Sequence, residues 1–286
     1  MNDLSVQVQK RLKLIDLYLA FTGSIQRSDL INHFDIGVAT ASRTLKLYRS
    51  AYPQNIEYSI SDRTYITAVT FNPAFQHSAV KALSLLAYGE VTHQIEMHKF
   101  GAPPNFRLAA GLEFDVVRAI TTAMVLKSAI TINYTSADSG EKTHVICPHC
   151  LFESGGSWYF RAYLLHKDRF TTFRFSRVTS ATSSTEVIDN KIFIESDTDW
   201  YQEVVLTIGP HPNREKKDAL REDLGLVDKP VVNIKTNAVL VGYLLTEMRV
   251  DSSENGSMNS DEYYLRLLNR HELIDINGMF IAPGFR

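Results

Sequence analysis

Apolar positions recur at three- and four-residue steps near the start of the chain, which is the period of one face of an α-helix. The stripe that predicts a first helix consists of Val8, Leu12, Ile15 and Leu19. Thr22-Gly23-Ser24 should end this helix, and Ser28 can cap a short second one. The apolar positions of the second helix are Leu30, Ile31 and Phe34. Two helices packed through their apolar faces are therefore expected before residue 35.

A tight turn at Asp35-Ile36-Gly37, in which Gly37 suits a positive φ, separates these helices from a third, predicted over about 39–48. The positions expected to face inward on the third helix are Val38, Ala41, Leu45 and Tyr48. Pro53 should stop it. Residues 56–68 then alternate about Ser61-Asp62-Arg63, which predicts a small β-hairpin. This order of elements is typical of a winged helix-turn-helix domain.

The third helix carries the residue types of a DNA-reading helix. Its polar face contains Thr40, Ser42, Arg43, Thr44, Lys46 and Arg49, with no acidic residue between positions 40 and 50. We expect Ser42 and Arg43 to face base edges, while Lys46 and Arg49 contact phosphates. Arg63, at the hairpin tip, is expected to reach a phosphate or the minor groove. The alternative is a three-helix packing unit whose basic residues are merely solvated.

The periodicity changes twice beyond residue 70. Residues 71–97 and 114–127 have helical patterns separated by a proline-containing loop, so two linker helices are expected, the first starting at Asn72-Pro73. From Ser128 the period becomes two. Four or five short strands joined by tight turns predict a small, strongly bent sheet or SH3-like barrel.

Four blocks in this strand-rich region resemble, in their order, the WYL domain of bacterial transcriptional regulators. They are Tyr134-Thr135-Ser136, Pro148-His149, Trp158 to Tyr163 and Phe173 to Val178. Phe160 departs from the Trp-Tyr-Leu tripeptide that gives the domain its name. The block over 148–163 is most similar to the BrxR and CapW type, which are repressors of phage-defence loci. The resemblance implies an Sm/SH3-like barrel that senses a nucleotide or a nucleic-acid fragment.

The residues that we expect to bind this effector are Tyr134, Ser136, His149, Tyr159, Arg161, Arg174 and Arg177. Strand alternation places Arg161 on the same face as Tyr159 and Tyr163, which suits a phosphate and a stackable base. Arg174 and Arg177 should lie on opposite faces of the last strand, so that only one of them reaches the ligand. Trp158 is expected to fill the barrel core.

The C-P-H-C motif of Cys147 and Cys150 looks at first like half of a zinc site or a redox pair. The chain has no other cysteine, and the motif lies between strands and not at a helix N-terminus. We therefore expect both cysteines to be small apolar fillers, with no metal and no cofactor. The common motifs of hydrolases and nucleotide-binding loops are absent. We expect no enzyme, and a Cys/His enzyme is the alternative that mutation of Cys150 would test.

Composition, net charge and length limit the class of protein and its cellular location. The chain has 286 residues, 44% of them hydrophobic and 22% charged, and a net charge of −2, so a DNA-binding surface must be local. Two cysteines and no membrane span or secretion signal favour the cytoplasm. Residues 200–286 mix strand and helix patterns and resemble the C-terminal extension of WYL regulators, which takes part in dimerisation. The polar segment 251–261 is predicted to be a mobile loop.

These observations predict an α+β protein with four segments. They are a winged helix-turn-helix at 1–70, a helical linker at 71–127, a WYL sensor domain at 128–199 and a dimerisation domain at 200–286. The predicted function is a homodimeric transcriptional repressor of a phage-defence operon that binds a pseudo-palindromic DNA operator and responds to a nucleotide or oligonucleotide. The alternative is an accessory protein that binds single-stranded nucleic acid through the barrel.

Overall fold

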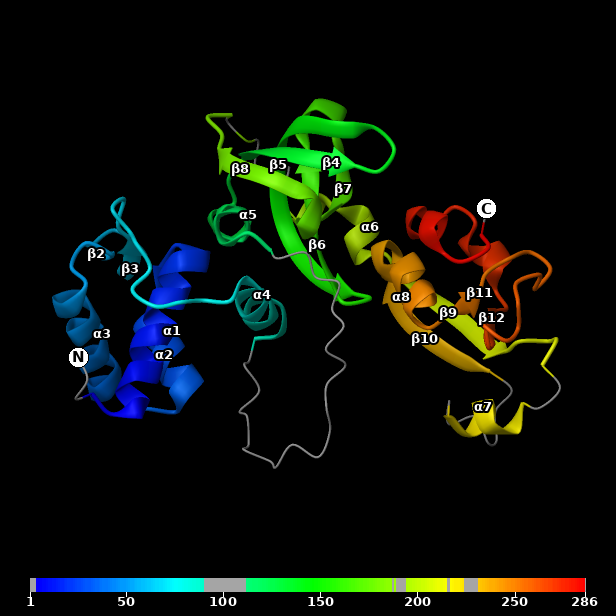
Figure 1. The fold of residues 1–286 in the computed structure, drawn as a ribbon, viewed down its shortest axis with the longest axis horizontal. Helices are drawn as coiled ribbons and strands as arrows, with labels where there is room; N and C mark the ends of the chain where they lie inside the picture. Colours follow the sequence, from blue (N-terminus) through cyan, green and yellow to red (C-terminus); the bar gives the residue numbers. More distant parts are fainter. Residues whose placement is uncertain are drawn as a thin grey trace. The chain divides into compact units, whose positions relative to one another are not determined.

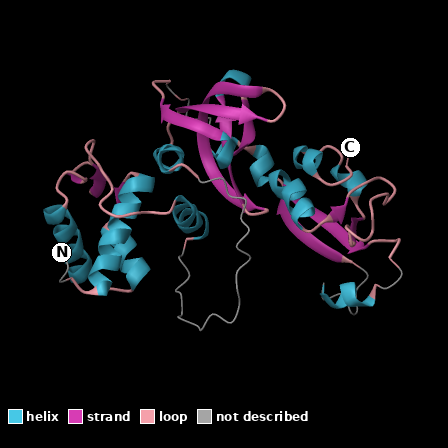
Figure 2. Ribbon diagram, viewed as in Figure 1, coloured by secondary structure: helices cyan, strands magenta, loops and turns pink. Residues whose placement is uncertain are grey.

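The fold is described from a computed structural model, which describes residues 4–89, 112–186, 188, 194–214, 217–223 and 231–285 (Figures 1 and 2). The chain forms two compact units. The first comprises residues 1–152 and 156–193, and the second comprises residues 153–155 and 194–286. Among the described helices, none is long and apolar enough to cross a membrane.

The first unit begins with a winged helix, as the sequence predicted. Its elements are α1 (Val6–Thr22), β1 (Ser24–Ile25), α2 (Arg27–Phe34), α3 (Val38–Ala51), β2 (Ile56–Ser59) and β3 (Thr64–Thr67). The strands form an antiparallel sheet in the order β1-β3-β2, in which β2 and β3 are the predicted hairpin. Gly23, at φ 76°, ends α1 in the left-handed conformation that glycine adopts at little cost.

Three local expectations in the winged helix were wrong. The N-cap of α2 is Gln26, and not Ser28, because the Asp29 carboxylate accepts a 2.6 Å hydrogen bond from the Gln26 backbone N–H. The left-handed residue between α2 and α3 is Asp35 at φ 50°, whereas Gly37 has φ −70° and caps α3. Val38 does not face inward but is 56% exposed, because it occupies the first turn of α3.

Two linker helices follow, α4 (Ala79–Tyr88) and α5 (Phe114–Leu126). The predicted start of the first helix at Asn72-Pro73 was wrong, because Ser78 is the N-cap and its side chain accepts from Lys81 N. The backbone N–H groups of Asn72, Ala74 and Phe75 instead bond to side chains of the winged helix. Residues 90–97 and the proline-containing loop lie outside the described part of the chain.

A five-stranded antiparallel sheet completes the first unit. Its strands are β4 (Ile130–Ser136), β5 (Gly140–Ser154), β6 (Ser157–Leu164), β7 (Arg169–Arg174) and β8 (Val178–Ser183), in the order β7-β6-β5-β4-β8. β7 and β8 are the two edges of this order, so the pairing in the described residues is that of a bent open sheet and not of a closed barrel. A short 3₁₀ turn, η2 (Phe175–Arg177), separates them.

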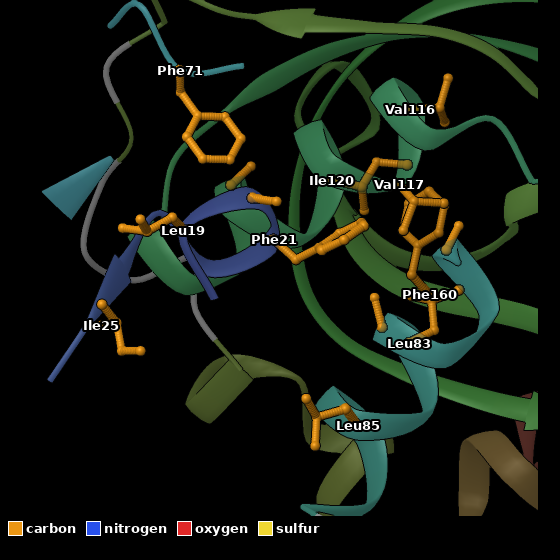
Figure 3. Packing of buried hydrophobic residues seen from close by; sticks show 14 of the residues in the cluster. Leu19, Phe21, Ile25, Phe71, Leu83, Leu85, Val116, Val117, Ile120 and Phe160 are labelled. Carbon is orange, nitrogen blue, oxygen red and sulfur yellow. The ribbon is translucent and has the colours of Figure 1, made fainter. Parts of the chain in front are cut away.

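One apolar cluster runs through the helices and the sheet of the first unit. Figure 3 shows part of it, where Phe21 of α1 packs near Val117 and Ile120 of α5. Phe160 of β6 is fully buried in the same cluster, with its ring centroid 5.4 Å from that of Phe173. Trp158 is 4% exposed, which confirms its predicted place in the core. The winged helix, the linker helices and the sheet therefore share a continuous core.

The second unit contains a four-stranded sheet covered by short helices. Its elements include α6 (Thr198–Tyr201), β9 (Glu203–Pro210), α7 (Asp218–Asp223), β10 (Val232–Asn237), α8 (Val241–Glu247), β11 (Val250–Asp251) and β12 (Leu265–Leu267). The sheet order is β10-β9-β12-β11. Gly242 of α8 is required by close packing, because a Cβ there would lie 2.2 Å from the Gly278 carbonyl oxygen.

The segment 251–261 of the second unit is anchored, contrary to the predicted mobile loop. Asp251 is fully buried and accepts hydrogen bonds from Ser253 N at 2.7 Å and Met258 N at 3.1 Å. His211 Nε2 lies 3.1 Å from the same carboxylate. Arg214 Nη1 donates to the Ser260 carbonyl at 2.9 Å. The prediction from polar composition was wrong because these polar groups form hydrogen bonds with one another.

Candidate nucleic-acid interface

The helix α3 is held at its start and along its inner face. The Gly37 carbonyl accepts hydrogen bonds from Thr40 N at 3.0 Å and Ala41 N at 3.1 Å, which begins the helix. Leu45 and Tyr48 are buried to 1% exposure or less, as predicted. The Tyr48 hydroxyl donates to the Asp16 carboxylate of α1, so a hydrogen bond supplements the apolar packing.

The outer face of α3 presents a row of cations. Arg43, Lys46 and Arg49 are all exposed and stand three residues apart, so they lie along one side of the helix. Ser42 is half-buried, and its hydroxyl donates to the Val38 carbonyl at 2.9 Å. Arg43 Nε donates to the Ala39 carbonyl at 3.2 Å, which folds its stem back toward the start of the helix. The first turns of such a helix are the part that meets base edges in helix-turn-helix proteins.

Thr44 does not belong to this outer face, and its predicted exposure was wrong. It is 4% exposed, and its hydroxyl donates to the Thr40 carbonyl at 2.9 Å within the same helix. Thr44 stands next to Leu45 on the inward side, where a threonine satisfies its hydroxyl within the helix. Thr40 itself is half-buried near the first turn.

The hairpin tip between β2 and β3 has a defined shape. The Asp62 carboxylate accepts from the Ser59 hydroxyl at 2.5 Å and from the Ser61 hydroxyl at 3.2 Å. Arg63 is exposed at this tip, where the prediction placed it, with φ 53°. Ile60 is 84% exposed beside it. The wing therefore offers one cation and one apolar side chain on a turn fixed by its own hydrogen bonds.

Two further features of this surface were missed from the sequence. Val38 and Ala39 are exposed in the first turn of α3, where apolar side chains can contact the methyl group of thymine. Arg27 is exposed in the first turn of α2. An N-cap placed at Gly37 would have predicted that Val38 and Ala39 are exposed, because residues just after an N-cap have few inward neighbours.

A second candidate surface lies on β5, β6 and β7. Tyr159 pairs in register with Arg174, whose guanidinium carbon is 5.8 Å from the Tyr159 ring centroid. The ring of Phe152 stacks on Tyr159 at 5.3 Å and 13°. Arg161, 7% exposed, follows on the same strand and pairs with Thr172. We call these five residues, together with His149, the sensor face.

His149 joins the sensor face through the ring of Phe170, which lies 5.3 Å away in an edge-on arrangement. Phe170 also contacts Tyr163 at 5.1 Å, and the Tyr163 hydroxyl donates to Asp168. The sequence prediction did not include Phe152, Phe170 or Thr172. Period-two alternation was the signal that could have found Phe152, which lies two residues from Cys150 on one strand face, and Phe170 and Thr172, which alternate with Thr171 on β7.

The other predicted effector residues have different surroundings. The Tyr134 ring packs edge-on against Phe173 at 5.0 Å on the core side, although its hydroxyl accepts from Arg174 N at 3.3 Å. Ser136 pairs with Gly140 at the β4–β5 hairpin. Arg177 is exposed in η2, so the expectation that it continues the strand of Arg174 was wrong. The strand breaks because the buried Phe175 begins a 3₁₀ turn.

The side chain of Arg174 is partly satisfied within the sheet. Its Nη2 donates to the Ser157 hydroxyl at 2.5 Å, while its buried Nε has no hydrogen-bond partner in the described residues. A buried donor without a partner is costly, so the protein leaves this guanidinium incompletely hydrogen-bonded. The geometry thus combines a guanidinium with stacked aromatic rings.

The two cysteines differ in burial. Cys147 is buried in the core, whereas Cys150 is half-buried. Burial raises the pKa of the Cys147 thiol to about 11, so it remains protonated near neutral pH. Within the described ranges, no group of three or more His, Cys, Asp or Glu side chains is placed to hold a metal ion.

Three family models match successive parts of the chain. The BrxR transcriptional regulator winged helix-turn-helix domain matches residues 7–87. The WYL domain matches residues 115–183, and the BrxR transcriptional regulator C-terminal dimerization domain matches residues 203–273. The three models follow one another without overlap, and each contains one of the sheets described above.

Curated relatives resemble the chain over most of its length. A “DNA-binding transcriptional repressor CapW” of Escherichia coli (strain KTE188) is 26% identical over 276 residues, which cover 93% of this chain and 90% of that protein. A protein of the same name from Pseudomonas aeruginosa is 27% identical over 280 residues, covering 94% of this chain and 91% of that one. A solved structure, “Proteasome accessory factor B/C (PafBC) of Arthrobacter aurescens”, aligns with 14% identity and a TM-score of 0.27, and covers 93% of this chain and 46% of that chain.

Proposed function

We infer the function from the family, because the chain belongs to the WYL-domain transcriptional regulators of the BrxR/CapW type. It is accordingly a DNA-binding transcriptional repressor with a C-terminal dimerisation domain. This family is a class of DNA-binding transcriptional regulators, which is not an enzyme class. We propose in addition which residues read DNA, which bind an effector, and what the repressor controls.

The observation that carries the DNA-binding proposal is the cation row of α3. Arg43, Lys46 and Arg49 are exposed on one side of a helix that contains no acidic residue. We assign Arg43, with Ser42 and Thr40 near the first turns, to base edges, and Lys46 and Arg49 to phosphates. Arg63 of the wing takes a phosphate or enters the minor groove. Val38 and Ala39 add apolar contacts to bases.

A dimer would place two α3 helices on two half-sites of one operator. A protein with two-fold symmetry matches a pseudo-palindrome, with a half-site spacing set by the dimer. We propose that the operator lies upstream of the genes of a phage-defence locus, as the family resemblance implies. Repression would then follow from occupancy of that operator.

We propose that the sensor face binds a nucleotide or a short oligonucleotide. Support comes from the guanidinium of Arg174 over the ring of Tyr159 and from the stacked ring of Phe152, which suit a phosphate and a base. The effector would shift the repressor only if it binds the DNA-competent and DNA-incompetent states with different affinities. An effector that bound both states equally tightly would not shift the equilibrium between them.

The test of DNA reading is Arg43→Ala in the full-length protein. We expect loss of operator binding in a fluorescence anisotropy titration while size-exclusion chromatography shows an unchanged oligomer. The matched control is Arg221→Ala, which removes an exposed arginine of α7 in the second unit. Operator binding by Arg43→Ala at the wild-type affinity would refute the assignment of α3.

The same aromatic and arginine face supports a second candidate function, the binding of single-stranded nucleic acid for its own sake. This function predicts that a single strand binds more tightly than a duplex of the same sequence. The repressor predicts the opposite preference for operator DNA. A competition titration between the two forms separates the candidates.

A further inference from the structure

The carboxylate of Asp16 lies in the middle of the apolar face of α1 and is fully buried. Its neighbours in sequence, Leu14 and Ile15, belong to the core. A buried ionised carboxylate is costly unless hydrogen bonds replace the water that it has lost. Asp16 therefore needs partners, and the structure supplies four.

The four donors to Asp16 come from two separate parts of the first unit. The Tyr48 hydroxyl donates from α3. The Ala74 and Phe75 backbone N–H groups donate at 3.1 and 3.2 Å, and His77 Nε2 lies 2.6 Å from Oδ2. One side chain of α1 thus bonds to the DNA-reading helix and to the segment that leads into α4.

Asn55 makes a second tie between the same two parts. Its side-chain amide donates to the Tyr48 hydroxyl at 3.3 Å and to the Asn72 carbonyl at 2.7 Å, and its carbonyl oxygen accepts from Asn72 N at 3.1 Å. Tyr48 therefore donates to Asp16 and accepts from Asn55. Burial and the hydrogen bond to Asp16 raise the pKa of Tyr48, which keeps the hydroxyl protonated as a donor.

The segment held by this network continues toward the sheet. Residues 72–77 lead into α4, which contacts α5, and α5 packs against both α1 and β8. Phe21 of α1 and Phe114 of α5 meet edge-on at 5.0 Å. Side chains with fixed partners thus connect α3, by way of residues 72–77 and α4, to α5, which is the helix that contacts the strands of the WYL domain.

We propose that Asp16 is a positioning residue for DNA reading, and that the Asp16–Tyr48 bond fixes α3 relative to the segment 72–77. The inference rests on the proposed function of α3 and adds residues that touch no DNA. An apolar residue at position 16 would fill the space, but it would not specify one orientation of α3. In other proteins, buried hydrogen-bonded groups fix how one helix is aligned against another. Loss of the bond lowers the fraction of protein whose α3 is in the binding-competent pose, which raises the apparent Kd.

The test uses the full-length protein with Tyr48→Phe, Asp16→Asn and the double variant. Tyr48→Phe keeps the ring and removes only the hydroxyl, so it remains informative if Asp16→Asn fails to fold. The matched control is Thr121→Val, which removes a buried hydroxyl whose hydrogen bonds, among the described residues, lie within α5. Circular dichroism first sets a temperature at which every variant is folded.

At that temperature we expect Tyr48→Phe to weaken operator binding roughly tenfold, the scale of one hydrogen bond to a charged group. Binding to unrelated duplex should stay within about twofold, because the phosphate-contacting cations remain. The double variant should lose less than the sum of the two single losses, since both changes act on one hydrogen-bond network. Thr121→Val should leave both affinities unchanged. Folded variants with wild-type operator affinity, or with additive losses, would overturn the proposal.

Amide hydrogen exchange without DNA separates this inference from the function on which it rests. Tyr48→Phe should speed exchange in residues 38–51 and in residues 72–77 together, while Thr121→Val should change neither segment. A response confined to one segment, or to neither, would refute the coupling whatever the protein binds. Failure of the wild-type protein to prefer operator over unrelated duplex would refute the proposed function and leave the exchange result to decide on Asp16.

Discussion

Replacement of Lys46 by glutamine should make operator binding less sensitive to salt. Lys46 is exposed in the middle of α3, between Arg43 and Arg49, and we assign it to a phosphate. Each neutralised phosphate of duplex DNA releases about 0.9 counterion, which sets the slope of log affinity against log salt concentration. Glutamine keeps most of the side chain and removes the charge.

The expected slope of log affinity against log salt concentration follows from the number of phosphate-contacting cations. If Arg63 takes a phosphate as Lys46 and Arg49 do, a dimer makes six phosphate contacts and the slope should be about −5.4. Lys46→Gln removes two contacts per dimer, which gives a slope of about −3.6. Between about 50 and 200 mM salt, the wild-type affinity should fall roughly 1,800-fold and that of the variant roughly 150-fold.

The assay is a fluorescence anisotropy titration of an operator duplex over this range of salt. The control is Lys10→Gln, which removes an exposed lysine of α1 outside the proposed interface. An unchanged slope for Lys46→Gln, or an equal change for Lys10→Gln, would show that the cation row of α3 does not contact phosphates.

Three other changes test the core, the second unit and the sensor face. Phe160→Ala should lower the free energy of unfolding by about 3–5 kcal/mol in urea denaturation, because the ring is fully buried against Phe173 and Phe175, and a loss under about 1 kcal/mol would contradict this packing. Burial alone would raise the pKa of Asp251, but hydrogen bonds from Ser253, His211 and Met258 lower it, so its stabilising effect is present above the unfolded pKa near 4 and lost as pH falls through the folded value. Asp251→Asn should therefore reduce the dependence of stability on pH in acid, and an unchanged profile would refute that role. Arg161→Ala should keep operator binding but lose the response to the effector, whereas loss of folding in circular dichroism would assign Arg161 to the core.

Much of the winged helix could be predicted because each of its elements has a strong local signal. The stripe of Leu12, Ile15 and Leu19 fixes the buried face of α1, and Gly23 ends it. The apolar alternation about Arg63 fixes the hairpin. Boundaries were less predictable, because capping depends on which side chain reaches the backbone. Asp29 bonds to the backbone of Gln26, and this moves the start of α2 away from Ser28.

The parts that escaped prediction depend on contacts between distant residues. Thr44 looks like a surface residue, but its place on the inner side of α3 follows from packing on α1 and α2. The break at Phe175 separates Arg174 from Arg177 because Phe175 turns into the core against Phe160. The role of Asp16 needed donors up to 61 positions away in the chain. A single charge inside an apolar stripe was the only sign of this network in the sequence.

Specific binding of the protein to DNA from upstream of its own gene would establish it as an operator-binding repressor. A gel shift should compare that duplex, an unrelated duplex and the upstream sequence as a single strand, each with and without short oligonucleotides or cyclic nucleotides. We expect a preference for the upstream duplex that at least one of these effectors weakens, and that Arg43→Ala abolishes. Equal binding of the two duplexes, or tighter binding of the single strand, would contradict it.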